Sequence, residues 1–249
     1  MWVDGRRIRV GQPKQQALLA LLALRRGSLV PVHEIIDALW DGTPPNRVRN
    51  QVQVYVAGLR RALAAAGAAR DLINTRGRAY RLDTPSSTVD LSVFEQVAAA
   101  AGRLASVGAL PAAARSLEAA LAIWRGPPLG GMTGQFFEQA AVGLEERRLA
   151  VLEQHMEVML ALGHHAGLVS RLRTTVAAYP LHEHFRYGLM LALYRCGRRA
   201  EALAVYRQGR HRIVGELGIE PGPELRTLEL CILRGEPVPA PASTGRHGS

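Results

Sequence analysis

Cysteine, lysine and aromatic residues are scarce in this chain of 249 residues, which has two cysteines, a single lysine and only 5% Phe, Trp and Tyr. Cys196 and Cys231 fit no metal-ligand spacing and do not suggest a disulfide framework, so we expect a protein of a reducing cytoplasm. The low aromatic content, together with abundant alanine, leucine and arginine, favours helices packed on helices over an aromatic-rich β-sandwich. The composition therefore predicts a mainly α protein.

Long hydrophobic runs, an export signal and catalytic motifs are also missing. The longest apolar run, Ala17 to Leu24, is far shorter than the roughly 20 residues needed to cross a bilayer. Met1 to Arg9 has no apolar segment followed by a cleavage site, so we expect a cytoplasmic protein without membrane insertion. Gly126 to Gly131 is glycine-rich but lacks the Gly-Lys-Ser/Thr ending of a phosphate loop, and no Ser-His-Asp, Cys-His or paired-carboxylate arrangement stands out. The sequence thus predicts neither an enzyme nor a cofactor.

Four histidines raise the question of a metal site: His164, His165, His182 and His184. Adjacent histidines on a helix point about 100° apart, and no carboxylate or cysteine partner has the usual ligand spacing. We therefore expect surface histidines and no bound metal.

Positive charge is concentrated in the first third of the chain. Residues 1–83 hold 14 Lys and Arg against 6 Asp and Glu, whereas the remainder holds 17 against 15. A local basic excess is typical of a polyanion-binding surface, because each arginine placed against a phosphate releases condensed counterions. Nucleic acid is the leading candidate partner, and the alternative is an arginine-rich solvated surface without a partner.

The first 45 residues predict a short hairpin followed by two helices. Trp2 to Val10 alternates in part around Asp4-Gly5, a pattern typical of a hairpin. Pro13 suits a first helical turn, and the leucines after it form an apolar face that ends at Gly27. Val32 to Trp40 predicts a second short helix, stopped by the glycine- and proline-rich loop that follows it.

The segment from Asn46 to Ala66 predicts the most informative helix. Valine and leucine recur every three or four residues and make one core-facing stripe. The stripe consists of Val48, Val52, Val56, Leu59 and Leu63. At about 100° per residue, the other face is largely polar. Arg47, Asn50, Val54, Ala57 and Arg61 point away from the stripe, and Gln51, Gln53 and Arg60 flank it. A major groove admits one α-helix, in which Asn or Gln can contact adenine while Arg contacts guanine or phosphate.

A basic hairpin is predicted after this helix. Leu72 to Thr75 and Arg76 to Leu82 have the pattern of two short strands joined by a turn that contains Gly77. Three helices followed by such a hairpin describe a winged helix. The arginines of the hairpin, Arg76, Arg78 and Arg81, are then expected to contact the backbone that flanks the groove, where they set affinity more than sequence preference.

The remainder of the chain predicts an all-helical domain. We expect a winged-helix domain over residues 1–83, a polar linker over 84–89, a helical domain over 90–235 and a disordered tail over 236–249. Glycine and proline divide the helical domain into about seven helices. A related pattern recurs 34 residues apart at Leu168-Val169 with Leu172 and at Ala202-Leu203 with Tyr206, which is the period of a tetratricopeptide-type helix pair. Trp40 and Trp124 lie on apolar stripes and are expected in the core.

Seven stretches, in order along nearly the whole chain, resemble a known family. In the first domain they are GQPKQQALLALL (Gly11 to Leu22), IDALW (Ile36 to Trp40), QVQVYV (Gln51 to Val56) and LRRAL (Leu59 to Leu63). In the second they are AIWRGP (Ala122 to Pro127), LMLALY (Leu189 to Tyr194) and ELGIEPGPEL (Glu216 to Leu225). With these motifs the chain resembles the Streptomyces antibiotic regulatory proteins, or SARP activators.

The resemblance implies an OmpR-like winged helix fused to a bacterial transcriptional activation domain of tetratricopeptide-like helices. It implies double-stranded promoter DNA and RNA polymerase holoenzyme as partners. The expected function is activation of a secondary-metabolite (antibiotic) gene cluster from direct repeats near the −35 element, bound by side-by-side protomers.

By position, the helix that begins near Arg47 is the recognition helix and the Arg76 to Arg81 hairpin is the wing. The loop expected to face the sigma subunit comprises Asp41, Gly42, Thr43, Pro44, Pro45 and Asn46. The candidate DNA contacts are Lys14, Arg47, Asn50, Gln51, Gln53, Val54, Tyr55, Arg60, Arg61, Arg76, Arg78 and Arg81.

One departure from the family bears on DNA recognition. Where the family has Ser-Arg in the recognition helix, this chain has Ala57-Gly58, which removes a cation from the groove face and introduces a helix-weakening glycine. An alternative function is therefore a tetratricopeptide-type protein adaptor with a degenerate winged helix. A second alternative, an enzyme or nucleotide switch, lacks a phosphate loop in this sequence.

Overall fold

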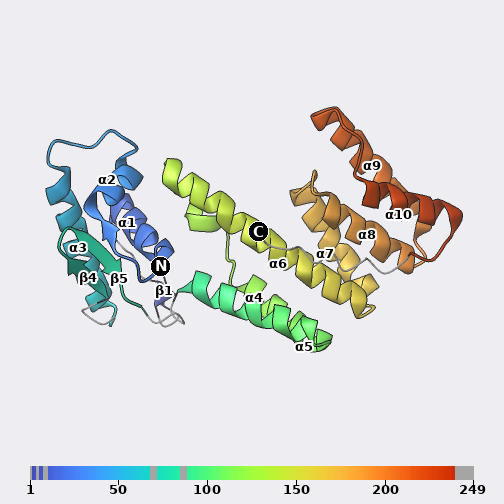
Figure 1. The fold of residues 1–249 in the computed structure, drawn as a ribbon, viewed down its shortest axis with the longest axis horizontal. Coiled ribbons are helices and arrows are strands. Elements are labelled where there is room, and N and C mark those ends of the chain that lie inside the picture. The colour runs from blue at the N-terminus through green and yellow to red at the C-terminus, as the bar shows by residue number, and fades with distance from the viewer. Residues whose placement is uncertain (1, 4–5, 8–10, 68–71, 85–88, 239–249) are drawn as a thin grey trace. The chain divides into compact units, whose positions relative to one another are not determined.

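A computed structural model describes residues 2–3, 6–7, 11–67, 72–84 and 89–238. It is mainly helical, as the composition predicts, with a winged helix followed by tetratricopeptide-like helices (Figure 1). Two compact units make up the chain, one of residues 1–99 and 119–149 and the other of residues 100–118 and 150–249. Among the described residues, no helix combines the length and the apolar character that crossing a membrane requires.

The winged helix lies in the first unit and follows the predicted order of elements. Its elements are β1 (Trp2–Val3), β2 (Arg6–Arg7), α1 (Pro13–Leu24), β3 (Val30–Pro31), α2 (Val32–Trp40), α3 (Val48–Ala65), β4 (Ile73–Arg76) and β5 (Ala79–Leu82). Strands β1 and β2 pair antiparallel, so the hairpin predicted near the start is confirmed there, although residues 4–5 and 8–10 lie outside the described part. Helix α2 has the predicted bounds, and α1 ends at Leu24, three residues before the predicted Gly27.

A three-stranded antiparallel sheet supports the wing in the order β3-β5-β4. The hairpin of β4 and β5 was predicted, whereas β3 was not, because two residues are too short to show a strand period. Val30 of β3 pairs with Tyr80 of β5. Pro31 has no N–H to donate, which an edge strand tolerates. In Figure 1 the hairpin lies beside α3.

The core of the winged helix is built from α1, α2, the inner stripe of α3 and the sheet. Val52, Val56, Leu59 and Leu63 of α3 are at most 2% exposed, which confirms four of the five predicted stripe residues as core, and Val48 is half-buried. Trp40 and Trp124 are both half-buried rather than fully enclosed. The buried stripe fixes which face of α3 points outwards.

One core residue of the winged helix comes from far along the chain. Phe137, in the first turn of α6 (Gln135–Ala161), is 1% exposed and belongs to the same hydrophobic cluster as Leu18 and Leu59. The guanidinium of Arg25 lies 5.7 Å from the ring centre of the neighbouring Phe136. Residues far beyond the winged helix in sequence therefore complete its core.

Phe137→Ala should destabilise the winged helix even though residue 137 lies outside it in sequence. Loss of a fully buried Phe removes its transfer free energy and leaves a cavity, at a cost of about 3–5 kcal/mol. Urea denaturation followed by circular dichroism measures this change. Val142→Ala on the same helix is the control, because Val142 is 60% exposed and a surface truncation changes stability by about 0.5 kcal/mol or less. Equal stability of the two variants would contradict the role of Phe137 in the core.

Seven α-helices lie between residues 89 and 238 of the described chain, in agreement with the predicted number. Besides α6 they are α4 (Asp90–Ser106), α5 (Leu110–Ala122), α7 (His165–Ala178), α8 (Glu183–Arg195), α9 (Arg199–Leu217) and α10 (Pro223–Arg234). A 3₁₀ turn, η2 (Pro128–Gly131), precedes α6. Helices α7 and α9 begin 34 residues apart, at 165 and 199, which confirms the predicted repeat. Consecutive helices from α7 to α10 pack on one another and bury the repeated apolar positions.

Two histidine–glutamate pairs join α6 to the start of α8 in the second unit. His182 Nε2 lies 3.4 Å from Glu153 Oε1, and His184 Nε2 lies 3.0 Å from Glu157 Oε1. The hydrogen bond to Glu157 raises the pKa of His184 above its usual 6.5. Within the described residues, no group of three or more His, Cys, Asp or Glu side chains is placed to hold a metal ion.

The His184–Glu157 pair should stabilise the protein on the acid side. Because the pKa of His184 is higher in the folded state, its contribution is fully present below the unfolded pKa of about 6.5 and is lost as pH rises through the folded pKa. Urea denaturation of the wild type and of Glu157→Gln should therefore differ more at about pH 5.5 than at about pH 8.5. Contributions from groups that the substitution leaves unchanged cancel in the comparison. A difference that grows with rising pH would contradict the assignment.

Candidate nucleic-acid interface

The outward face of α3 carries most of the predicted recognition residues. Arg47, the N-cap of α3, is exposed, as are Asn50, Gln53, Val54 and Arg61. Val54 is 56% exposed, a high value for a valine. Gln51 is half-buried at the side of this face. The helix therefore presents amide and guanidinium groups around one apolar side chain.

The loop between α2 and α3 is exposed along its whole predicted length, residues 41–46. It turns sharply after α2, where Asp41 adopts a left-handed conformation with φ of 46°. The backbone N–H and the hydroxyl of Thr43 both donate to the carbonyl oxygen of Trp40, each over 3.0 Å. These bonds close the end of α2 and leave the next three residues as a surface loop.

Tyr55 is buried in the structure, in contrast to its prediction as a DNA contact. Although the sequence made it a candidate DNA contact, Tyr55 is only 8% exposed, and its ring stacks on Trp40 with ring centres 6.1 Å apart. It lies among the core residues of the winged helix, so its side chain is not part of the outward face. We leave it out of the proposed interface.

Lys14 and Arg60 are held by intramolecular contacts. The amine of Lys14 donates to the carbonyl oxygen of Leu39 and lies 5.4 Å from the ring centre of Trp40. Arg60 donates from Nε and Nη2 to the carbonyl oxygen of Ile73, over 3.0 and 2.7 Å. Their observed partners make Lys14 a link between α1 and α2, and Arg60 a link between α3 and β4.

The wing presents two exposed arginines around a tight turn. Gly77 begins the turn between β4 and β5 with φ of 57°, a left-handed conformation that glycine adopts without a Cβ clash. Arg76 and Arg78 on either side are exposed, and no described residue forms a hydrogen bond or an ion pair with their guanidinium groups. Their guanidinium groups are therefore available to an external anion.

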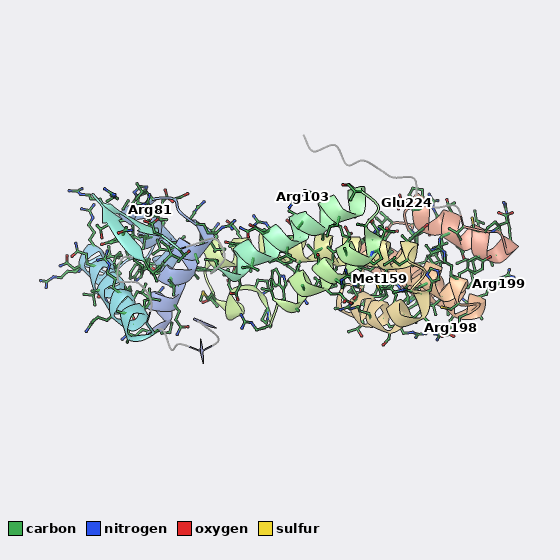
Figure 2. All side chains as sticks on the ribbon, turned by 90° about the horizontal axis from the view of Figure 1, so that it is seen from below. Arg81, Arg103, Met159, Arg198, Arg199 and Glu224 are labelled. Carbon is green, nitrogen blue, oxygen red and sulfur yellow. The ribbon has the colours of Figure 1, made fainter. Side chains whose placement is uncertain are left out.

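Arg81, the third wing arginine and labelled in Figure 2, is engaged within the protein. Its Nε lies 2.6 Å from Asp83 Oδ1, and its Nη2 donates to Asp83 Oδ2 over 2.7 Å. Hydrogen bonds from Arg81 and Asn74 lower the pKa of Asp83, which keeps this carboxylate charged at neutral pH. The pair cancels the charge of Arg81, so Arg81 is a weaker phosphate-binding candidate than Arg76 or Arg78.

Arg49 is a candidate that sequence analysis missed. It lies in the first turn of α3 and is exposed, and its side chain has no hydrogen bond or ion pair with any described residue. At about 100° per residue it lies about 140° from Val54 around the helix, next to the core stripe, which is why the periodicity did not single it out. Its charge next to Arg47 was the available signal.

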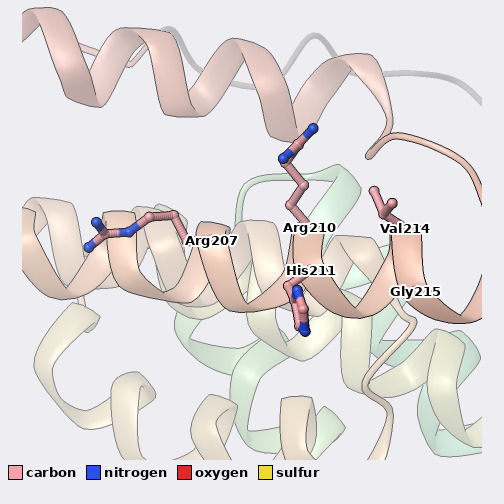
Figure 3. Close-up of a pocket in the computed structure, with 5 residues that line it drawn as sticks. All are labelled: Arg207, Arg210, His211, Val214 and Gly215. Carbon is pink, nitrogen blue, oxygen red and sulfur yellow. The ribbon is translucent and has the colours of Figure 1, made fainter.

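A second basic surface lies on α9 in the other unit. Arg207, Arg210, His211, Val214 and Gly215 line a shallow pocket of about 290 Å³. Figure 3 shows Arg210 and His211 pointing to opposite sides of the helix. Arg210 Nε also donates to Glu220 Oε2 over 2.7 Å in an ion pair. These cations do not converge on one point, so α3 and the wing remain the stronger anion-binding candidate.

Two family profiles match the chain in the order of its folds. "Transcriptional regulatory protein, C terminal" matches residues 6–82, and "Bacterial transcriptional activator domain" matches residues 89–233. The chain belongs to the SARP family of transcriptional regulators. This confirms the resemblance found in the sequence, and the family names are those of transcriptional regulators.

Curated relatives and a solved structure agree with this family. Regulatory protein AfsR of Streptomyces coelicolor is 39% identical over 97% of this chain, which spans about a quarter (24%) of that relative. Regulatory protein DnrI of Streptomyces peucetius is 36% identical, with 92% of this chain and 90% of the relative covered. The structure of Mycobacterium tuberculosis EmbR in complex with a low-affinity phosphopeptide aligns with a TM-score of 0.91 and 35% identity, covering 96% of this chain and 64% of that chain.

Exposed and paired arginines should differ in the salt dependence of duplex binding. Arg78→Ala or Arg61→Ala should reduce the slope of log K against log salt by about one, because each removes one phosphate-neutralising cation. Arg81→Ala should change the slope less, because Asp83 already neutralises Arg81. Fluorescence anisotropy titrations over a series of KCl concentrations measure the slopes. Unchanged slopes for both exposed arginines would contradict the assignment of this surface.

Proposed function

We propose that this regulator binds double-stranded promoter DNA in a sequence-specific manner and activates transcription from it. The observation that carries the proposal is the exposed polar face of α3 beside a wing in which the guanidinium groups of Arg76 and Arg78 have no partner among the described residues. A helix for the groove and cations for the flanking backbone are the two parts that a winged-helix DNA-binding protein needs.

Each part of the surface has a chemical role in this proposal. Asn50 and Gln53 offer amides that can pair with adenine in the major groove, while Arg47 and Arg61 bind guanine or phosphate at the two ends of the face. Val54 lies between them as an apolar contact. The wing arginines neutralise phosphates and fix the register of the helix in the groove.

Activation is proposed to require contacts beyond DNA. We propose that protomers bind side by side on direct repeats near the −35 element and recruit RNA polymerase holoenzyme. The exposed loop of residues 41–46 is assigned to the sigma subunit. The family membership supports a secondary-metabolite (antibiotic) gene cluster as the target. In this arrangement α3 selects the promoter and the loop presents the bound protein to the polymerase.

A combined binding and transcription assay tests the function. The wild type should retain duplexes selected from a random library and stimulate transcription in vitro from a promoter that carries the selected sequence. Asn50→Ala should lower affinity for that sequence by about 1–3 kcal/mol if its amide pairs with a base. The double variant Pro44→Ala/Asn46→Ala should keep DNA affinity and lose stimulation.

The outcomes separate the proposed parts. Absence of any duplex binding by the wild type, even at low salt, would contradict DNA recognition and favour the protein-adaptor alternative. Full stimulation by the loop variant would contradict only the assignment of residues 41–46 to the polymerase.

A further inference from the structure

The recognition helix has a glycine where another helix comes very close. Gly58 lies on α3, half-buried, one turn after the exposed Val54. A Cβ built at Gly58 would lie 2.3 Å from Nε2 of Gln15, a residue of α1. The space that a side chain at position 58 would occupy is therefore filled by the carboxamide of Gln15.

The orientation of this carboxamide is set by the start of α1. The backbone N–H of Gln12 donates to Gln15 Oε1 over 3.0 Å. A backbone N–H can only donate, so the atom that faces it is the oxygen and the other end is the amino group. Nε2 is consequently directed towards Gly58. No described residue accepts a hydrogen bond from this Nε2.

A second glycine leaves room for the same side chain. A Cβ at Gly11 would lie 1.5 Å from Gln15 Oε1, so the carboxamide is held between two positions that lack side chains. Such close approach is possible only at glycine. Gly11 and Gly58 together place one amide donor in a defined position.

That position borders the outward face of α3. At about 100° per residue, position 58 lies about 40° from Val54 around the helix, on the same side as Gln51. The face therefore has an amino group at its edge that belongs to α1. Ala57 and Gly58 carry no charge, and the missing Cβ of Gly58 leaves the space for this amide.

We propose that Gln15 is a DNA-contacting residue of this protein and that Gly58 is what places it. Gln15 Nε2 donates to an acceptor atom of the duplex, either a phosphate oxygen or a base edge, and this contact rests on the proposed function. Gln15 thus supplies from α1 the contact that α3 lacks at position 58. Because the donor is neutral, its contribution does not depend on salt through counterion release.

Gly58→Ala provides the sharpest test, because it should move stability and affinity in opposite directions. Alanine in a helix interior is more favourable than glycine, so the thermal midpoint should rise. The added Cβ displaces the Gln15 amide, which is the flexible end of a side chain, and DNA affinity should fall by about two- to tenfold, the worth of one hydrogen bond. Calorimetry and anisotropy titrations on a duplex selected by the wild type measure the two quantities.

Variants of Gln15 test whether displacement of its amide causes the loss of DNA affinity in Gly58→Ala. Gln15→Ala should lose a similar factor of affinity with an unchanged salt slope, and Gln15→Glu should lose more because a carboxylate replaces the donor. The double variant Gln15→Ala/Gly58→Ala should bind no more weakly than the weaker single variant, since both remove one contact. Titration of a random duplex in parallel distinguishes the acceptors: equal losses on both duplexes indicate a phosphate, and a loss on the selected duplex alone indicates a base.

Two control variants separate the loss of the Gln15 contact from helix stabilisation and from loss of a neighbouring amide. Gly143→Ala in α6, where a Cβ would meet nothing within 4 Å, tests helix stabilisation alone and should leave affinity unchanged. Gln16→Ala removes a neighbouring exposed amide that donates to the carbonyl oxygen of Gly11 over 3.2 Å; it tests loosening of the start of α1 with the Gln15 amide retained, and should lose less affinity than Gln15→Ala. Wild-type affinity in Gly58→Ala and Gln15→Ala, or additive losses in the double variant, would overturn the inference while leaving DNA binding intact. Failure of the wild type to bind would instead overturn the proposed function.

Discussion

The burial of one stripe of α3 against the winged-helix core is the constraint on which the rest of the structure depends. Val52, Val56 and Leu59 are removed from water by packing with α1, α2 and the sheet. Since the helix cannot rotate without exposing them, its opposite face has a fixed direction. The polar residues on that face become a surface with a defined order of chemical groups, and Phe137 strengthens the same core from beyond the linker.

Pairing within the protein then decides which positive charges are available to a ligand. Asp83 neutralises Arg81, and the carbonyl oxygen of Ile73 occupies Arg60, whereas Arg76 and Arg78 face solvent. The first third of the chain therefore has more basic residues than it has basic side chains free to contact phosphate. The free cations lie at the wing and towards the ends of α3, while Arg60 joins α3 to β4 and Arg81 is neutralised within the wing strand.

Much of the fold was predictable because it follows from short-range patterns. The valine and leucine period identified α3 and its inner stripe, and Gly77 between alternating residues identified the wing turn. The 34-residue recurrence identified the helix pairs of the second half. Strand β3 was missed because two residues show no period. Tyr55 was misplaced because its stacking partner, Trp40, lies on a separate helix.

The sequence by itself determined the order of the helices and of the wing hairpin, the family and the polar face of α3, since each depends on spacing along one segment. Only the tertiary structure decided which polar side chains near that face are free, because their partners come from distant segments. Lys14 meets the carbonyl oxygen of Leu39, and the amide of Gln15 fills the space above Gly58. Hydrogen bonding and steric exclusion act over a few ångströms in space, and no spacing along the chain encodes which helix ends come that close.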